Sequence, residues 1–460
     1  MTTFALENPS TGRSEESFER IDDSDRDPIL DRATAAQREW RATDIEERAA
    51  ILRRTADIYA ERKEDLAEII GREMGKLRRQ AIGELGSVEA IYRWYADHAH
   101  ELLADKELPA EGNLRTFVRK DPLGVVLGIM PWNYPYYQVA RWAAPNLLVG
   151  NSLVLKHASL CPLSSQACQD ILEEAGLPEG VFQNIYASGS QMDAFVADKR
   201  VAAVSLTGSE DAGGAVAKTA GEYLKKSLLE LGGNDPYVVL DDHNLDQVLR
   251  LYVGARMSNA GQSCTAPKRL IVLDDFYDRA LEYLTGKIGG LKVGEWNEED
   301  VKVGPLSSIS ARDEIVERIK EAEANGDAKI VVGGRALDRD GAYMEPTLLT
   351  DINPRADIGR NEVFGPVALL YRASDVDDAV AIANDTDYGL GSYVFGSDLE
   401  QARAVASRME AGMTWINEPG GGAPGEPFGG IGRSGYGREL GEWGVNEFAN
   451  EHLFRVSGPM

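Results

Sequence analysis

The feature of this sequence that most constrains its fold is an alternation of short apolar runs with helical patterns, which begins near residue 123. The apolar runs are of strand length and lie at 125–129, 152–155 and 201–205. The helical patterns that accompany them lie at 163–174, 191–197 and 213–220. Because parallel strands need a crossover connection, usually a helix, this order predicts βαβ units and a parallel sheet.

The alternation is repeated in the second half of the chain. Its strand-like runs are 237–240, 269–272 and 330–332, and its helical patterns are 245–257, 276–288 and 311–324. Ahead of both stretches, residues 28–105 read mostly as helix, because the apolar residues of 46–64 recur on one helical face. We therefore predict an α/β fold with two α/β domains.

Two further segments read as extended chain. Residues 113–120 alternate in the manner of a strand, and 447–456 form a strand-like tail. Together they predict a small β arm. Since an unpaired strand edge is an aggregation hazard, we expect the arm to pair with another subunit.

The chain is strongly acidic. Its 460 residues include 75 Asp and Glu against 49 Lys and Arg, a formal net charge of −26. Such a surface repels nucleic-acid phosphate and anionic lipid, so we expect neither nucleic acid nor membrane as a partner. Only 15 of the basic residues are lysine. An acidic, lysine-poor surface keeps a protein soluble in high salt, and our hypothesis is a halophilic cytoplasm; an acidic mesophile is the alternative.

The chain has three cysteines, Cys161, Cys168 and Cys264, and no CxxC motif. Its five histidines form neither HExxH nor a His-x₃-His pair. We therefore predict no disulfide framework and no metal site, and a reducing cytoplasm fits. No apolar run approaches the ~18 residues of a membrane span. The N-terminus lacks the basic start and apolar stretch of a secretion signal.

Two residues stand out as candidates for covalent chemistry. Cys264 lies in the small polar turn 261–265, where an ionised thiol would be a nucleophile; a buried, inert cysteine is the alternative. Glu230 ends an apolar run just before two glycines. A carboxylate in partly apolar surroundings has a raised pKa and can serve as a general base, while a solvated acid at a strand end is the alternative.

Two turns offer hydrogen-bond donors. Asn133 lies between Pro131 and Pro135, and a rigidly held amide can donate to a developing oxyanion; an Asn-capped proline turn is the alternative. Gly208 and Ser209 form a turn between a predicted strand and a predicted helix, where backbone N–H groups suit phosphate oxygens. The G-x-G-x-x-G dinucleotide fingerprint is absent there.

Taken in order, these motifs resemble the aldehyde dehydrogenase superfamily. They read MPWNYP, VLKHAS, TGS, LELGG, GQSC, EVFGP and PFGG, and the resemblance runs from NPSTG near the N-terminus to the tail. REMGK at 72–76 and LKHA at 155–158 are most similar to a succinate-semialdehyde dehydrogenase branch. The resemblance implies NAD(P)-dependent oxidation of an aldehyde, most readily succinate semialdehyde, to its acid.

The resemblance also assigns catalytic roles. Cys264 matches the nucleophile, which forms a thiohemiacetal and then a thioester with the aldehyde. Asn133 and the Cys264 backbone N–H match the oxyanion hole, and Glu230 matches the base that activates water for hydrolysis. Cys161 and Cys168 are interpreted as structural.

The implied cofactor is NADP or NAD. The matching cofactor-binding positions are Ile129, Trp132, Lys156, Ser159, Gly208, Ser209, Gly232, Glu362 and Phe364. NAD-preferring relatives often carry Glu where this chain has Ser159, and a carboxylate there repels a 2′-phosphate. Because Lys156 and His157 add positive character beside Ser159, we expect NADP to be accepted. The alternative is that Ser159 is neutral and both cofactors work.

The implied substrate contact is Arg141, eight residues after Asn133. In succinate-semialdehyde dehydrogenases an arginine at this spacing holds the substrate carboxylate; a structural salt bridge is the alternative. This chain departs from the pattern twice, because Ser258 replaces a second arginine of some branches and the loop 418–426 has no hydroxyl. A 2-oxoglutarate semialdehyde, lactaldehyde or a broad aliphatic range therefore stays open.

The resemblance finally implies a domain order. A Rossmann-like cofactor domain would span 1–112 and 122–230, a catalytic domain 231–425, and an oligomerisation arm 113–121 and 445–460. The expected assembly is a homodimer or homotetramer. Two rival classes are a hydrolase that needs no cofactor and a catalytically silent protein of the same fold. The matching cofactor positions argue against the first class, and the matching catalytic residues argue against the second.

Overall fold

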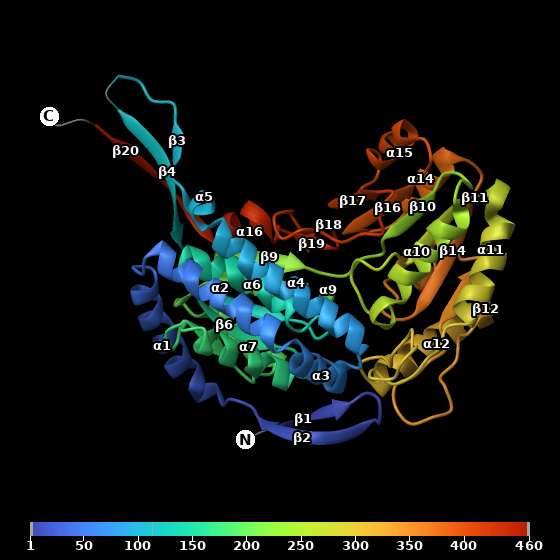
Figure 1. Cartoon of the computed structure of the whole chain (residues 1–460), viewed down its shortest axis with the longest axis horizontal. Helices are drawn as coiled ribbons and strands as arrows, with labels where there is room; N and C mark the ends of the chain where they lie inside the picture. The colour runs from blue at the N-terminus through green and yellow to red at the C-terminus, as the bar shows by residue number, and fades with distance from the viewer. Residues whose placement is uncertain (1–2, 113, 458–460) are drawn as a thin grey trace.

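The computed structural model describes residues 3–112 and 114–457, which form two α/β lobes with a β arm at one end (Figure 1). The chain begins with an antiparallel hairpin of β1 (Thr3–Asn8) and β2 (Arg13–Glu19). Five helices follow, which confirms the helical prediction for 28–105. They are α1 (Arg26–Trp40), α2 (Ile45–Glu61), α3 (Lys63–Met74), α4 (Arg78–Asp97) and α5 (Ala99–Leu103).

The first lobe is built on a six-stranded sheet in the order β19-β9-β8-β5-β6-β7. Its five parallel strands are β5 (Val125–Met130), β6 (Ser152–His157), β7 (Phe182–Asn184), β8 (Val201–Thr207) and β9 (Lys226–Glu230). The short β19 (Gly435–Tyr436) pairs antiparallel with β9. The predicted parallel sheet is confirmed.

Helices cover both faces of this first sheet, as the continuous apolar strands require. The covering helices of the crossovers are α6 (Tyr137–Val149), α7 (Pro162–Glu174), α8 (Met192–Ala197) and α9 (Glu210–Glu222). Val126 and Leu153 face the cluster that includes α2, α4 and α6, whereas Val125 and Val154 face the cluster of α1, α8 and α9. The period-2 alternation of strand side chains thus supplies two hydrophobic layers.

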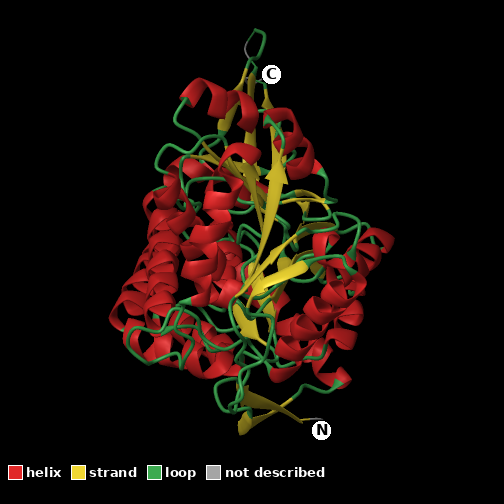
Figure 2. Cartoon of the chain, turned by 90° about the vertical axis from the view of Figure 1, so that its right-hand side faces the viewer, coloured by secondary structure: helices red, strands yellow, loops and turns green. Residues whose placement is uncertain are grey.

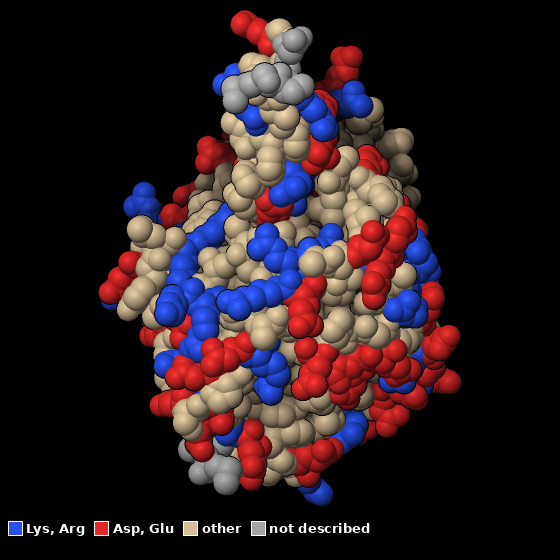
Figure 3. All heavy atoms as spheres, turned by 90° about the vertical axis from the view of Figure 1, so that its left-hand side faces the viewer, with Lys and Arg blue, Asp and Glu red and all other residues tan. Residues whose placement is uncertain are grey.

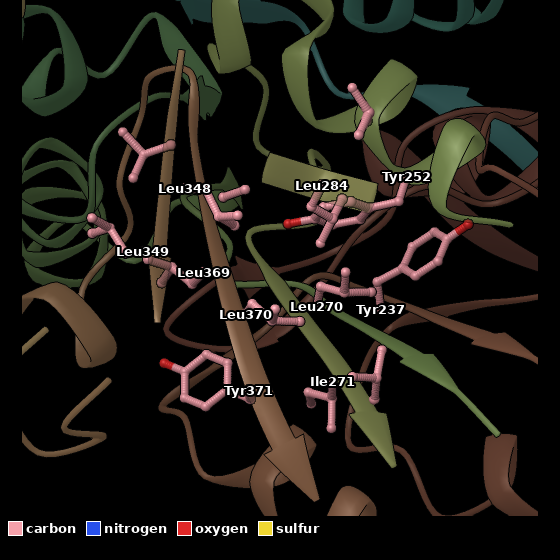
Figure 4. Packing of buried hydrophobic residues seen from close by; sticks show 14 of the residues in the cluster. Tyr237, Tyr252, Leu270, Ile271, Leu284, Leu348, Leu349, Leu369, Leu370 and Tyr371 are labelled. Atoms are coloured by element: carbon pink, nitrogen blue, oxygen red, sulfur yellow. The ribbon is translucent and has the colours of Figure 1, made fainter. Parts of the chain in front are cut away.

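The second lobe contains a seven-stranded sheet in the order β12-β13-β14-β11-β10-β16-β17. The strands are β10 (Pro236–Val239), β11 (Arg269–Leu273), β12 (Lys329–Val332), β13 (Thr347–Thr350), β14 (Val367–Ala373), β16 (Gly391–Phe395) and β17 (Met413–Ile416). The helices are α10 (Leu245–Met257), α11 (Asp274–Gly289), α12 (Ile309–Asn325), α14 (Val376–Asn384) and α15 (Leu399–Ala406). Leu270 and Leu370 pack between sheet and helices with Tyr252 and Leu284 (Figure 4).

The arm projects from the first lobe (Figures 1 and 2). It is a three-stranded antiparallel sheet of β20 (Ala449–Val456), β4 (Arg115–Pro122) and β3 (Lys106–Leu108). The boundaries differ from our prediction in two places. Residues 106–108, which we assigned to the first domain, pair with β4, and Glu447 ends a helix, α16 (Gly441–Glu447). Residues 113 and 458–460 of the predicted arm lie outside the described residues.

The two lobes are linked where β9 ends at Glu230 and β10 begins at Pro236. The segment 426–445 returns to the first lobe, where α16 packs against α6. In parallel α/β sheets, ligands bind beyond the carboxyl ends of the strands. The carboxyl ends of β5, β8 and β9 lead to Trp132, Ser209 and Glu230, so these residues approach the second lobe together. Within the described ranges, no helix has the length and apolarity needed to cross a bilayer.

Candidate active site

Cys264 follows a turn with an unusual backbone. In the short helix η3 (Ser258–Gly261), Asn259, Ala260 and Gly261 all have positive φ, at 51°, 53° and 73°. Gly261 is required there, because a Cβ on it would lie 2.1 Å from a backbone oxygen of Gly365. Strained, left-handed residues of this kind cluster at functional sites. This turn carries the chain into the half-buried Cys264.

Asn133 lies beside the nucleophile segment. Its Nδ2 donates to the backbone oxygen of Gln262 at 3.2 Å, and its buried Oδ1 has no partner among the described residues. Asn133 and Cys264 line one cavity. The structure thus brings the predicted amide donor and the predicted nucleophile together across the two lobes.

Glu230 is buried, with 1% of its surface exposed. Neither carboxyl oxygen has a hydrogen-bond partner within the described chain, and a Cβ on Gly429 would lie 2.7 Å from Oε1. Burial, and then the neighbouring Glu439, raise the pKa of Glu230 well above its usual value. The alternative of a solvated acid at a strand end is therefore wrong, because Glu230 is buried and burial favours its neutral form.

Cys264 is also held in its neutral form. Burial raises the pKa of its thiol to about 12, against the opposing charges of Arg141 and Lys268. Lys268, which sequence reasoning missed, donates to the backbone oxygen of Ser263 at 2.9 Å. Its ammonium also lies 2.7 Å from Glu362 Oε1. Lys268 therefore joins the nucleophile segment to a residue expected to hold the cofactor.

A cavity of about 270 Å³ on one side of Cys264 gathers most of the predicted cofactor positions. The predicted residues that line it are Trp132, Asn133, Gly208, Ser209, Gly232, Cys264, Glu362 and Phe364. Ser209 is the N-cap of α9, so the helix N-terminus faces this cavity with the positive end of its dipole. A Cβ on Gly232 would lie 2.6 Å from Glu362 Oε2, so only glycine leaves this space open. These residues fit a dinucleotide.

The other three cofactor positions lie outside that cavity. Ile129 on β5 pairs with Lys156 on β6, and Ser159 is exposed in the turn that follows β6. His157 does not add the positive charge that we expected. Burial lowers its pKa to about 4, because it is enclosed beside Pro135, so it is neutral at pH 7. A positive charge near Lys156 comes instead from Arg20, which no sequence pattern indicated. Burial is the larger cause that lowers the pKa of Lys156, and repulsion by the Arg20 charge lowers this pKa further.

A second cavity, of about 480 Å³, lies on the opposite side of Cys264. Arg141 lines it together with Tyr134, Tyr137 and Phe428. The Arg141 side chain is 1% exposed and forms an ion pair with the buried Glu439. Burial lowers the pKa of Arg141, but Glu439, Tyr137 and other neighbouring groups together raise it by more, so the guanidinium stays charged.

Arg141 thus forms a structural salt bridge, which was the alternative to a role in substrate binding. It nevertheless also lines the cavity beside Cys264. Glu439 was missed because it lies 298 residues from Arg141 and no local pattern joins them. The loop 418–426 contributes Gly421, Gly422 and Glu426 to the cavity and no hydroxyl, as its sequence predicts.

Known proteins are similar to this chain in sequence and in fold. The aldehyde dehydrogenase family model matches residues 1–453. Succinate-semialdehyde dehydrogenase (NADP+) of Deinococcus radiodurans is 44% identical over 453 residues, 98% of this chain and 94% of that protein. A probable succinate-semialdehyde dehydrogenase (NADP+) of Synechocystis is 41% identical over 447 residues, 97% of this chain and 98% of that protein.

A solved structure agrees with these matches. The succinic semialdehyde dehydrogenase of Streptococcus pyogenes, crystallised with NADP+, superimposes with a TM-score of 0.96 at 40% identity, over 99% of this chain and 100% of that one. The match extends through both lobes and the arm. This chain belongs to the aldehyde dehydrogenase family.

Proposed function

We propose that this enzyme oxidises a short aldehyde bearing a carboxylate, succinate semialdehyde, to the dicarboxylic acid, with NADP as the cofactor. The observation that carries the substrate is Arg141, a buried cation in the same cavity as Cys264. Its Nη1 has no hydrogen-bond partner among the described residues, although its Nε donates to Glu439 at 2.6 Å. A buried charged donor without a partner is costly, and a substrate carboxylate would satisfy it.

The residues around the thiol divide the chemistry. Cys264 would lose its thiol proton to solvent and its Sγ would attack the aldehyde carbon, and Asn133 Nδ2 would leave Gln262 to donate to the oxygen that becomes negative. One such donor is worth about 3 kcal/mol in the barrier. A bound nicotinamide supplies the hydride acceptor. Glu230, once deprotonated, would take a proton from the water that releases the acid, and its raised pKa makes it a competent base.

The choice of NADP follows from the charges near β6. Ser159 leaves the exposed turn after β6 without a carboxylate, and Lys156, on which the charge of Arg20 acts, precedes it by three residues. The relatives named above that use NADP+ support the same cofactor. Ser159→Glu would place a negative charge beside a 2′-phosphate, and we expect it to shift the ratio of kcat/KM towards NAD. An unchanged ratio would contradict this role for Ser159.

Initial-rate kinetics in high-salt buffer test the substrate. Succinate semialdehyde, 2-oxoglutarate semialdehyde, lactaldehyde and propanal would each be assayed with NAD and NADP, with Cys264→Ser as the inactive control. We expect kcat/KM for succinate semialdehyde to exceed the others at least tenfold, which is about 1.4 kcal/mol. Arg141→Leu should raise KM at least tenfold for this substrate and little for propanal. A flat profile, or a neutral aldehyde as the best substrate, would remove the succinate proposal.

We further propose that the arm joins copies of this chain in the cytoplasm. β20 is an edge strand, and Leu453 and Val456 on it are 53% and 49% exposed. The three unpaired cysteines fit a reducing compartment. Light scattering should show a dimer or tetramer, and Leu453→Glu should lower its mass to that of a smaller species. A monomer for the unaltered protein would contradict the assembly.

A further inference from the structure

A buried ion pair that the reaction does not use lies directly behind the Asn133 turn. Lys76 follows the C-cap of α3, and Glu84 lies in α4. Neither residue lines the two cavities around Cys264. The Lys76 ammonium is 2.5 Å from Glu84 Oε2, and both side chains are 0% exposed. Burial lowers the pKa of Lys76, against the attraction of Glu84.

Both members of this pair hold the backbone of the Asn133 turn. Lys76 Nζ donates to the Asn133 backbone oxygen at 2.7 Å and lies 3.6 Å from the centre of the Tyr134 ring. Glu84 Oε1 accepts from the backbone N–H groups of Tyr136 at 3.0 Å and of Tyr137 at 3.2 Å. Lys76 therefore binds the turn at Asn133, and Glu84 binds it at Tyr136 and Tyr137, so hydrogen bonds fix the backbone on which the proposed oxyanion donor stands.

The same carbonyl is linked to the nucleophile segment. Asn259 Nδ2 donates to the Asn133 backbone oxygen at 2.9 Å and to the Gln262 backbone oxygen at 3.1 Å. Asn133, Gln262 and Lys76 thus meet at one network that ends two residues before Cys264. Movement of the Asn133 turn would change the distance between the amide donor and the thiol.

We propose that Lys76 and Glu84 are positioning residues that hold Asn133 Nδ2 where the oxyanion forms. A buried ion pair is weak evidence for stability, because desolvation cancels much of its attraction. Preorganisation of an oxyanion donor, in contrast, demands placement within about 0.5 Å. The proposal rests on the role of Asn133 in the proposed function, but not on which aldehyde is the substrate.

The test is a double-mutant cycle between Lys76→Met and Asn133→Ala, measured in single turnovers with the aldehyde that the wild type oxidises fastest. We expect Lys76→Met to lower the rate at least tenfold, with the KM for aldehyde and the Kd for NADP within twofold of wild type. In the Asn133→Ala background the same change should cost less than threefold, since the donor it positions is gone. Lys63→Met is the matched control, because it breaks a more exposed ion pair, between Lys63 of α3 and Glu89 of α4.

Two results would overturn the proposal. One is a rate for Lys76→Met equal to that of Lys63→Met. The other is a full, multiplicative loss when Lys76→Met is added to Asn133→Ala, which would show that the pair acts elsewhere. If Lys76→Met does not fold, Glu84→Gln carries the same cycle, because it removes the charge that holds Lys76 and keeps the side-chain volume.

Discussion

Cys264 and Glu230 influence each other's ionisation, because a charge on Glu230 raises the pKa of the Cys264 thiol. The pKa values of both groups are raised because burial disfavours their charged forms. The two cations nearest to the thiol, Arg141 and Lys268, offset this effect only in part. The resting thiol is therefore neutral, and the attack proposed for Cys264 begins with loss of its proton.

The raised pKa of the Cys264 thiol predicts how the rate of its alkylation depends on pH. Because the Cys264 pKa is about 12, the thiolate fraction rises about tenfold per pH unit below it. Inactivation of the cofactor-free enzyme by iodoacetamide should therefore accelerate continuously from pH 7 to pH 9. Cys161 and Cys168 are 0% exposed and should not compete, and mass spectrometry of the labelled peptide checks this. A plateau below pH 9 would show that the thiol ionises more readily than its burial implies.

A second prediction concerns the loss of the ion pair between Glu439 and Arg141. Glu439→Gln removes the charge that Arg141 is paired with, and a lost bond to a charged group costs about 2 kcal/mol in the free energy of unfolding. KM for a carboxylate-bearing aldehyde should rise several-fold, because the guanidinium is no longer oriented, while KM for propanal should not change. Denaturant melts and kinetics measure the two effects. Glu442→Gln, at an exposed ion pair, is the control and should stay within about 0.5 kcal/mol.

At the scale of elements, the carboxyl ends of the parallel strands create the site. β5, β8 and β9 end in register, so their following turns deliver Asn133, Ser209 and Glu230 to one edge. The sequence predicted β5 and β8 to within about two residues, because each is a continuous apolar run between turn residues, but it assigned no bounds to β9. It did not predict the hairpin of β1 and β2, whose second strand is almost wholly exposed and carries no burial pattern.

His157 at the end of β6 predicts a loss of stability in acid. Its Nδ1 accepts from the Ala158 N–H at 2.8 Å and its Nε2 lies 3.0 Å from the Pro135 oxygen, an arrangement that only a neutral ring satisfies. The folded pKa of about 4 is below the unfolded value near 6.5, so this stabilisation is complete above pH 6.5 and is lost as the pH falls towards 4. The loss amounts to about 3 kcal/mol.

Denaturant unfolding between pH 7.5 and 4 measures this slope. The difference in free energy of unfolding between wild type and His157→Gln should shrink as the pH falls, because glutamine does not titrate. The exposed His100→Gln is the matched control and should follow wild type throughout. A constant difference between wild type and His157→Gln across the range would contradict the proposed titration.

At the scale of the whole molecule, the excess of acidic side chains is spread over the surface. On the face shown in Figure 3, Asp and Glu form crowded groups with Lys and Arg between them. With a net charge of −26, the acidic side chains repel one another. Salt screens that repulsion, because the Debye length falls to about 3 Å at 1 M.

Thermal unfolding in increasing KCl tests the halophilic hypothesis. We expect Tm to rise by several degrees between low salt and about 2 M KCl at pH 7.5, since screening removes repulsion that the unfolded chain largely escapes. Near pH 4.7, the isoelectric point, the rise should be much smaller because the net charge is close to zero. Equal stability and activity with and without molar salt would identify an acidic protein without salt adaptation.

The sequence by itself determined the α/β class and the order of the two lobes, and it singled out Cys264 as the candidate nucleophile, because these depend on local patterns and on motifs in a set order. Only the tertiary structure decided what each site residue contacts. Arg141 and Glu439 are 298 residues apart, and Asn133 is 129 residues from its partner Gln262. The raised pKa of Glu230, the neutrality of His157 and the placement of Lys76 depend on burial and on distances of a few ångströms between such remote segments, which no local pattern encodes.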